Sequence, residues 1–230
     1  MWDSVILTFL CVNTSFNKCS INLASEEKNI ILNENRNTPP SDIISILVKE
    51  TLKTASLKMN DISGIITILG PGNYTSIRVG IAFSLGLSKS ISMPIYGISA
   101  LEAISISQRA IFKKNESHLV SIKAVKNEFF FQAFNYLSDP LSKPIKSKLS
   151  DIDKLLSYRD LVLIGPGSSE IGGLIDIKNK ITEVKDYIDY QKVITHIIKK
   201  PDQYNNIVPL YLSDPLAEKK DISWFVKKEI

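Results

Sequence analysis

The chain has 230 residues, of which 44% are hydrophobic and 23% charged, and it carries a net charge of +4. This length suffices for one large domain or two small lobes with their own cores, and the composition is typical of a soluble globular protein. The 28 basic residues are mostly lysines in scattered pairs rather than in one stripe. The positive charge is therefore only weak support for a nucleic-acid partner.

The start of the chain and its two cysteines bear on where the protein resides. No run approaches the roughly 18 apolar residues that a membrane helix requires. Residues 1–12 are apolar but contain Asp3 and lack a basic segment, so we interpret them as a buried strand rather than a secretion signal. Cys11 and Cys19 form neither a disulfide framework nor a metal motif, and we expect two free thiols packed as small apolar groups. These features predict a cytoplasmic protein without membrane association.

The first hundred residues predict a mixed α/β lobe. Apolar strands at 5–12, 19–23 and 27–32 are joined by short polar turns, which indicates an antiparallel meander. The remaining predicted elements of this part are a helix at 41–57, a strand at 62–69, a helix at 75–90, a strand at 94–98 and a helix from 99. Antiparallel strands that lead into crossover helices are typical of an α/β lobe, which we assign to residues 1–100.

The second half predicts a further lobe. A hairpin is expected from 119–123 and 128–135, followed by a short helix at 151–157, a buried strand at 160–164 and a helix at 187–199. We assign residues 101–205 to this second lobe. Residues 206–230 are expected to form a C-terminal tail that packs back on the first lobe.

The sequence offers little to build a catalytic or metal site. His118 and His196 are its two histidines, and neither has a partner at the spacing of metal ligands. Both are interpreted as structural or exposed. The chain has no H-x-x-x-H, C-x-x-C, G-x-S-x-G, Walker A or G-x-G-x-x-G motif. We therefore expect no catalytic residue, no metal and no cofactor on this chain.

The strongest local feature is a strand, a glycine-rich turn and a helix over residues 64–82. Glycines let the backbone turn sharply, and the first amides of the helix are suited to hold an anion. A merely rigid turn is the favoured alternative, because Gly-Pro-Gly alone is a weak signal. The turn and its candidate anion cradle comprise Gly70, Pro71, Gly72, Asn73, Tyr74 and Thr75.

The helices at 41–57 and 75–90 have more apolar sides than one sheet can cover. On the second helix, Ile77, Ile81 and Leu85 line one side, whereas Val79, Phe83 and Leu87 line nearly the opposite one. Either stripe is a candidate for the sheet side. A large internal core would explain the excess, but we favour a partner protein. The residues assigned to that interface are Ile43, Ile44, Leu47, Val48, Ile77, Arg78, Ile81 and Leu85.

A family resemblance rests on these same segments. Residues 70–82 read GPGNYTSIRVGIA, and residues 94–103 read PIYGISALEA. They resemble the TsaB (YeaZ) family, whose usual form is G-P-G-S-F-T-G-L-R-I-G-x-A followed by P-x-x-G-V-S-S-L-E-A. A first hairpin with Asn13, Thr14 and Ser15 resembles the opening I-D-T-S of that family, and residues 209–212 resemble its C-terminal P-x-Y-L-R. The resemblance is dense over residues 1–135, thin over 136–205 and returns near 209.

The resemblance implies a two-lobe fold of the actin, Hsp70 and sugar-kinase type, which is ribonuclease H-like. It implies that the two first-lobe helices pair with TsaD, and that the catalytic centre, metal and nucleotide belong to TsaD, with TsaE as accessory ATPase. TsaD transfers a threonylcarbamoyl group to the adenosine beside the anticodon of ANN-decoding tRNAs. A TsaB-type chain is then a scaffold without a cofactor, which meets tRNA through the complex.

Three positions depart from the family pattern. Asn13 stands where Asp is frequent, Ser76 where Gly is common, and Ser213 where Arg follows the Tyr-Leu pair. An amide is a poorer ligand for a hard cation than a carboxylate. This weakens the main alternative, an autonomous ATP-dependent phosphotransferase or ATPase of the same fold. A further alternative is a homodimer through the same helix surface when TsaD is absent.

Overall fold

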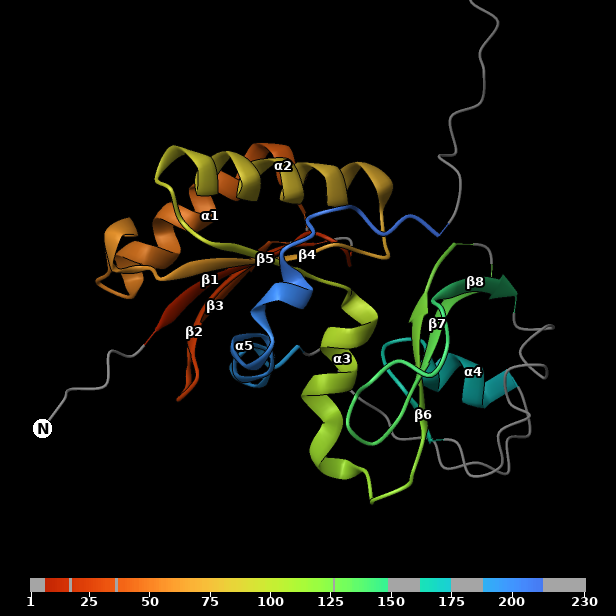
Figure 1. Ribbon diagram of the computed structural model, residues 1–230. Helices are drawn as coiled ribbons and strands as arrows, with labels where there is room; N and C mark the ends of the chain where they lie inside the picture. Colours follow the sequence, from red (N-terminus) through yellow and green to blue (C-terminus); the bar gives the residue numbers. More distant parts are fainter. Residues whose placement is uncertain are drawn as a thin grey trace, which may run out of the picture.

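The computed structural model describes residues 7–16, 18–35, 37–125, 127–148, 162–174 and 188–212, which form two β-sheets with helices around them (Figure 1). The strand orders are β3-β2-β1-β4-β5 and β8-β7-β6-β9. The helix expected at 151–157 lies outside the described residues. Within the described part of the chain, no helix is long and apolar enough to span a membrane.

The first sheet contains the predicted meander. β1 (Thr8–Asn13), β2 (Cys19–Ser25) and β3 (Asn29–Asn35) pair antiparallel, and β4 (Gly64–Ile68) and β5 (Ile95–Ile98) continue the sheet in parallel from β1. The crossover helices α1 (Pro40–Thr54) and α2 (Tyr74–Ser90) cover one face, and α3 (Ala100–Gln108) and α5 (Tyr190–Lys199) lie at the other (Figure 1). The sheet is thus buried on both sides, which explains the continuous apolar run of β1.

Successive residues of β1 point to opposite faces of the sheet. Leu10 and Val12 join the core beneath α1, whereas Phe9 and Cys11 join the core shared with α3 and α5. Cys19 belongs to the core of Leu10, so the two buried, free thiols lie in different cores. Burial raises the pKa of both thiols, that of Cys19 to about 11. Both cysteines therefore behave as the apolar packing groups that the sequence predicts.

The second sheet is built on the predicted hairpin. β6 (His118–Lys123) and β7 (Glu128–Phe134) pair antiparallel, β8 (Ile145–Lys148) extends the sheet from β7, and β9 (Val162–Ile164) lies parallel to β6. A short helix, α4 (Ser168–Leu174), follows β9. Neither β8 nor α4 was predicted from the sequence. The first is a four-residue strand of alternating Ile, Lys and Ser, and the second has only seven residues, two of them glycine.

Helix α5 differs from the predicted lobe boundary. The sequence assigned residues 187–199 to the second lobe, but α5 packs against β2 and α3. Its buried side chains are Tyr190, Val193, Ile194 and Ile197. The Gln191 amide nitrogen donates to the carbonyl oxygens of Glu26 and Glu27, at 3.0 and 2.9 Å. The strongly apolar face of α5 thus completes the core beneath the first sheet, because this face of the sheet must also be covered.

His118 is a structural residue in this fold. It is fully buried at the start of β6, stacks on Phe112 with ring centroids 3.9 Å apart, and places Nε2 2.7 Å from Ser105 Oγ. Burial lowers its pKa from 6.5 to about 3. The interpretation of His118 as structural is therefore supported by its burial and its contacts.

Because His118 stays neutral in the folded chain, the free energy of unfolding decreases at acidic pH. In the unfolded chain the His118 imidazole takes up a proton below pH 6.5, whereas in the folded chain it does so only near pH 3. The contribution of neutral His118 to the free energy of unfolding is therefore present above pH 6.5 and is lost as the pH falls below it. The loss from this residue is about 2 kcal/mol at pH 5. Urea unfolding at pH 7 and pH 5 measures it, and His118→Gln should show a drop smaller by about that amount. An equal drop in the wild-type chain and the variant would contradict this account.

Candidate functional site: the first hairpin, the glycine turn and the helix pair

The glycine turn connects β4 to α2. Asn73 caps the helix, because its Oδ1 accepts a hydrogen bond from the Ser76 backbone N–H at 3.0 Å. The helix therefore begins at Tyr74, one residue before the predicted start. Gly70 has φ of +102°, and a Cβ there would lie 2.8 Å from Ile77 Cδ1. The positive φ, and the Leu210 carbonyl oxygen 3.0 Å from the same Cβ, therefore favour glycine at position 70.

The first hairpin lies directly against this turn and against α2. A Cβ at Gly72 would come within 2.2 Å of the Ser15 carbonyl oxygen, and a Cβ at Gly80 within 2.4 Å of Thr14 Oγ1. The Thr14 hydroxyl donates to the Ser76 carbonyl oxygen at 2.7 Å. The structure therefore brings together the predicted hairpin, turn and helix. The glycines are explained by this close approach.

Asn13 has a local structural role. Its side chain is 3% exposed, and its Oδ1 accepts the Ser15 backbone N–H at 2.9 Å, which closes the hairpin turn. At the glycine turn, the Ser76 amide is already bound by the Asn73 cap, and the Ser15 carbonyl presents an acceptor oxygen to Gly72. These contacts account for the turn by capping and close packing, and the anion cradle at residues 70–75 stays a prediction. Among the described residues, no group of three or more His, Cys, Asp or Glu could hold a metal ion.

Arg78 joins the helix to the segment at 205–212. Its Nε donates to the Tyr211 hydroxyl at 2.8 Å, its Nη2 donates to the Tyr74 hydroxyl, and the two tyrosine rings lie 4.3 Å apart. The hydrogen bond to Tyr211 is the main cause that raises the pKa of Arg78. The Leu210 N–H donates to the Leu69 carbonyl oxygen at 2.7 Å. Arg78, assigned to the partner surface, is thus exposed but engaged with its own chain.

Arg78 and Tyr211 each lie in a stretch that resembles the family, but the sequence does not show that the two side chains are in contact. Arg78 and Tyr211 are 133 positions apart, so spacing could not show that they meet. Ser213, where the expected arginine is absent, lies outside the described residues.

The burial of the helix pair corrects the predicted interface. Ile77 and Ile81 are 1% and 4% exposed, so the stripe that they form faces the sheet, together with Gly80, Ser84 and Ser88. Phe83 and Leu87, the other candidates for the sheet side, pack at the edge of the core that contains α1. The buried residues that had been assigned to the interface are Ile44, Leu47, Val48, Ile77 and Ile81.

Small side chains explain why the correct stripe was not recognised. The apolar stripes of α2 were drawn through its large side chains alone, which leaves its small residues out. Of these, Gly80, Ser84 and Ser88 are buried and mark where the helix approaches the sheet and the first hairpin, as the contact of Gly80 with Thr14 shows. Of the predicted interface, Ile43, Arg78 and Leu85 remain at least partly exposed.

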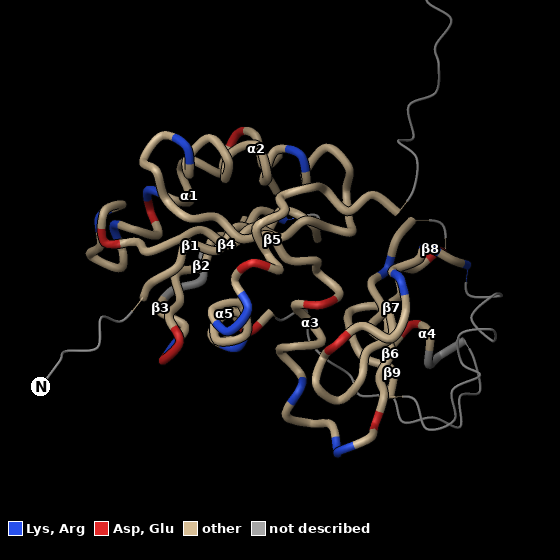
Figure 2. The backbone as a smooth tube through the Cα atoms, in the orientation of Figure 1, with Lys and Arg blue, Asp and Glu red and all other residues tan. Residues whose placement is uncertain are grey.

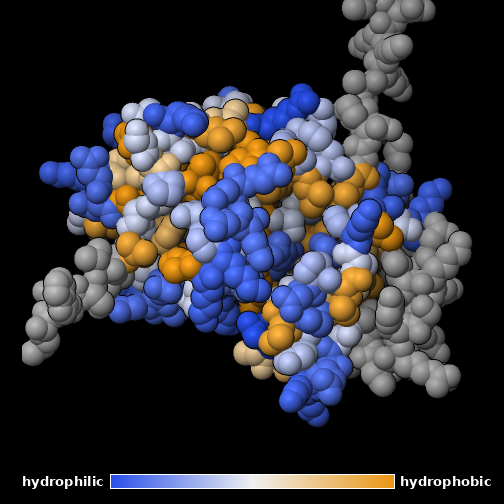
Figure 3. All heavy atoms as spheres, viewed as in Figure 1, coloured by the Kyte–Doolittle hydropathy of each residue, from blue (hydrophilic) through white to orange (hydrophobic). Residues whose placement is uncertain are grey.

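A different set of residues points away from the sheet, and we name it the outer face: Ile46 on α1 and Val79, Ala82 and Gly86 on α2. At 100° per residue, these α2 positions lie opposite Ile77 and Ile81. Ile46 is 47% exposed, Ala82 and Gly86 are exposed, and Val79 is half-buried. Figure 3 shows hydrophobic residues on the surface over α2. The described part of the chain leaves this apolar face uncovered.

Comparison with known proteins identifies the family. A protein-family model described as "TsaD: tRNA N6-adenosine threonylcarbamoyltransferase" matches residues 40–188. The tRNA threonylcarbamoyladenosine biosynthesis protein TsaB of Buchnera aphidicola subsp. Baizongia pistaciae is 26% identical over 223 residues, which cover 91% of this chain and 100% of that protein. The chain belongs to the TsaB (YeaZ) family.

Further comparisons agree with this family. The TsaB of Buchnera aphidicola subsp. Schizaphis graminum is 32% identical over 117 residues, 50% of this chain, and the match spans only 54% of that relative. The structure of YeaZ from Pseudomonas aeruginosa superposes with a TM-score of 0.71 at 16% identity, over 90% of this chain and all of that one.

The predicted fold class is confirmed. A Bacteroides thetaiotaomicron protein with an actin-like ATPase fold superposes with a TM-score of 0.50 at 11% identity, over 85% of this chain and 99% of that one. The two mixed sheets with crossover helices are therefore those of the actin-like TsaB fold.

Proposed function

We propose that this chain is a non-catalytic subunit that pairs with a TsaD-type protein through its outer face, for threonylcarbamoylation of the adenosine beside the anticodon in ANN-decoding tRNAs. The names of its relatives support the process, since they are described as tRNA threonylcarbamoyladenosine biosynthesis proteins. The observation that carries the pairing is the exposed glycine Gly86 in the C-terminal half of α2.

No contact within the described part of the chain requires glycine at position 86. An added Cβ would meet no heavy atom within 4 Å, in contrast to Gly80, where it would meet Thr14. Glycine in a helix interior costs about 1 kcal/mol relative to alanine. A second protein whose backbone approaches α2 at Gly86 and Ala82 accounts for this cost. The pair of helices α1 and α2, with Ile46 exposed on α1, is suited to such an interface, which buries about 800 Å² per partner.

The first hairpin supports a role without catalysis on this chain. The Asn13 amide is buried and bound within its own turn, and the Ser15 carbonyl contacts Gly72 directly. An actin-like ATPase needs acidic metal ligands and room for phosphates at these turns. TsaD and the accessory ATPase TsaE are then the proposed sites of metal and nucleotide chemistry, and tRNA is met in the complex.

Co-purification tests this proposal. The full chain and the TsaD of the same organism, mixed at micromolar concentration, should elute together in size-exclusion chromatography as a heterodimer. The chain alone should form at most a homodimer through the same face and should neither hydrolyse ATP above background nor transfer threonylcarbamoyl. Separate elution of the two proteins, or robust turnover by the single chain, would overturn the proposal.

A further inference from the structure

A cavity of about 480 Å³ lies at the far side of the first sheet from α1 and α2. It is open to solvent and is lined by the end of α3 with the following 3-10 helix η2 (Arg109–Ile111), by the loop after β7, and by α5. Cavities of about 300–1,000 Å³ are the usual size for small-ligand pockets. The lining residues are Ile106, Arg109, Ala110, Phe112, Tyr136, Leu137, Gln191, Lys192, Thr195, His196 and Lys199.

The charged side chains that line the cavity are all basic. Arg109, Lys192 and Lys199 line it, and no carboxylate is among the lining residues. Lys192 is held in place, because its Nζ donates to the Ser107 carbonyl oxygen at 2.8 Å and lies 3.3 Å from Asp189 Oδ2. Figure 2 shows the basic residues on α5 and at the end of α3. The cavity is thus suited to a negatively charged group.

The remainder of the cavity is apolar and aromatic. Ile106, Phe112 and Leu137 supply apolar walls, and Tyr136 adds a half-buried ring. A base stacks on such side chains while cations bind its phosphate, which is the usual recognition of single-stranded RNA. A purely inorganic anion would make no apolar or stacking contact with these walls.

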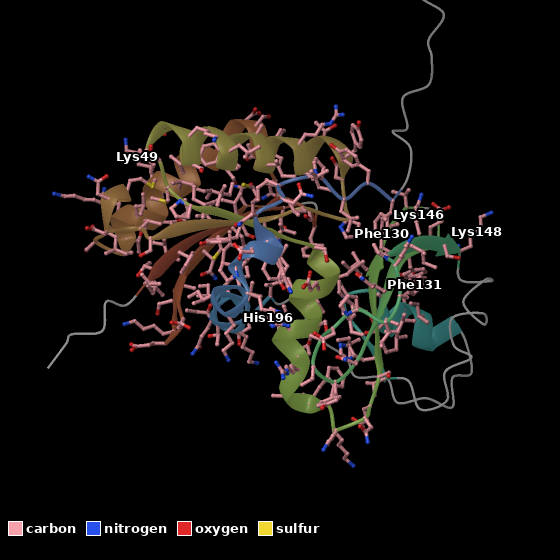
Figure 4. All side chains as sticks on the ribbon, viewed as in Figure 1. Lys49, Phe130, Phe131, Lys146, Lys148 and His196 are labelled. Atoms are coloured by element: carbon pink, nitrogen blue, oxygen red, sulfur yellow. The ribbon has the colours of Figure 1, made fainter. Side chains whose placement is uncertain are left out.

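The pKa of His196 depends on the charges around this cavity. It is partly buried on α5, edge-on to Tyr204 at 6.0 Å (Figure 4). Burial lowers its pKa, followed by the positive charges of Lys200, Arg109 and Lys199, whereas Asp139 acts in the opposite direction. A bound phosphate would offset these cations and raise the pKa of His196.

We propose that this cavity binds a nucleotide, with the base against Phe112, Tyr136 and Leu137 and the phosphate between Arg109 and Lys199. The choice of RNA as the source of that nucleotide rests on the proposed function, because the TsaD substrate is tRNA. A free mononucleotide has the same chemistry, so the experiment has one arm for each source.

Binding to the isolated full chain tests the cavity. Fluorescence anisotropy with labelled tRNA, and calorimetry with AMP, should each be compared for the wild type, Arg109→Glu and Lys199→Glu. We expect each reversal to weaken tRNA binding about tenfold at low salt, since charge-assisted hydrogen bonds are the strong ones. Lys49→Glu is the matched control, because Lys49 is exposed on α1, across the sheet from His196 (Figure 4).

The two histidines provide a readout that non-specific attraction would not give. In NMR titrations, bound nucleotide should raise the pKa of His196 and leave the fully buried His118 unchanged. Binding of AMP without tRNA would assign the cavity to a free nucleotide. Equal weakening by Lys49→Glu and Lys199→Glu, or an unchanged His196, would overturn the proposal. TsaD co-purification does not depend on this cavity, so failure here is distinguishable from failure of the proposed function.

Discussion

Ile81→Glu should unfold the isolated chain. Ile81 is 4% exposed in α2, which packs on β4 and β1. A carboxylate there is buried without a counter-charge, which costs several kcal/mol. Domains of this size have about 5–15 kcal/mol of total stability. Thermal unfolding by circular dichroism should show loss of the cooperative transition or a markedly lowered Tm.

Ile81→Val is the control for this variant. It removes one methylene from the same position and should cost about 1 kcal/mol. A folded Ile81→Glu chain with a wild-type Tm would contradict the orientation of α2 described above.

Ala82→Glu should abolish pairing with TsaD while the chain stays folded. Ala82 is the neighbour of Ile81 in sequence but is exposed on the outer face. Glutamate is a good helix former, so the Tm should change little. At an interface where two backbones approach closely, the longer charged side chain must be buried or must separate the helices. Size-exclusion chromatography with TsaD should show loss of the complex.

Two further variants sharpen this test. Ser169→Glu adds the same charge at an exposed position of α4 and should leave the complex intact. Gly86→Ala should raise the stability of the chain by about 1 kcal/mol and yet weaken pairing. If Gly86→Ala stabilises the chain without any effect on pairing, the partner does not approach α2 at Gly86.

Much of the fold could be predicted because the buried strands and amphipathic helices carry strong periodic patterns. The meander, both crossover helices and the hairpin of the second lobe follow from apolar runs and turn residues. The position of α5 could not be predicted, because hydrophobic periodicity shows that a helix has a buried face but not which sheet it covers. The Gln191 contacts with Glu26 and Glu27 join positions about 165 residues apart.

The segments of the candidate site were identified from the sequence, but neither their mutual contacts nor the orientation of α2 was. In the structure the glycine turn, the first hairpin and α2 lie together. The outer face was missed because α2 is apolar on both sides, and a helical wheel alone does not show which side meets the sheet. Gly80 decides the question, since only glycine fits against Thr14. The contrast between Gly80 and Gly86 became visible only with the neighbouring strands in place.

The threonylcarbamoyladenosine content of cellular tRNA tests the central claim most directly. The gene for this chain should be depleted in its own organism and replaced by the wild type or by Ala82→Glu, with mass spectrometry of nucleosides from total tRNA. We predict that depletion removes the modified nucleoside, that the wild type restores it, and that Ala82→Glu does not. An unchanged content after complete depletion would contradict the account.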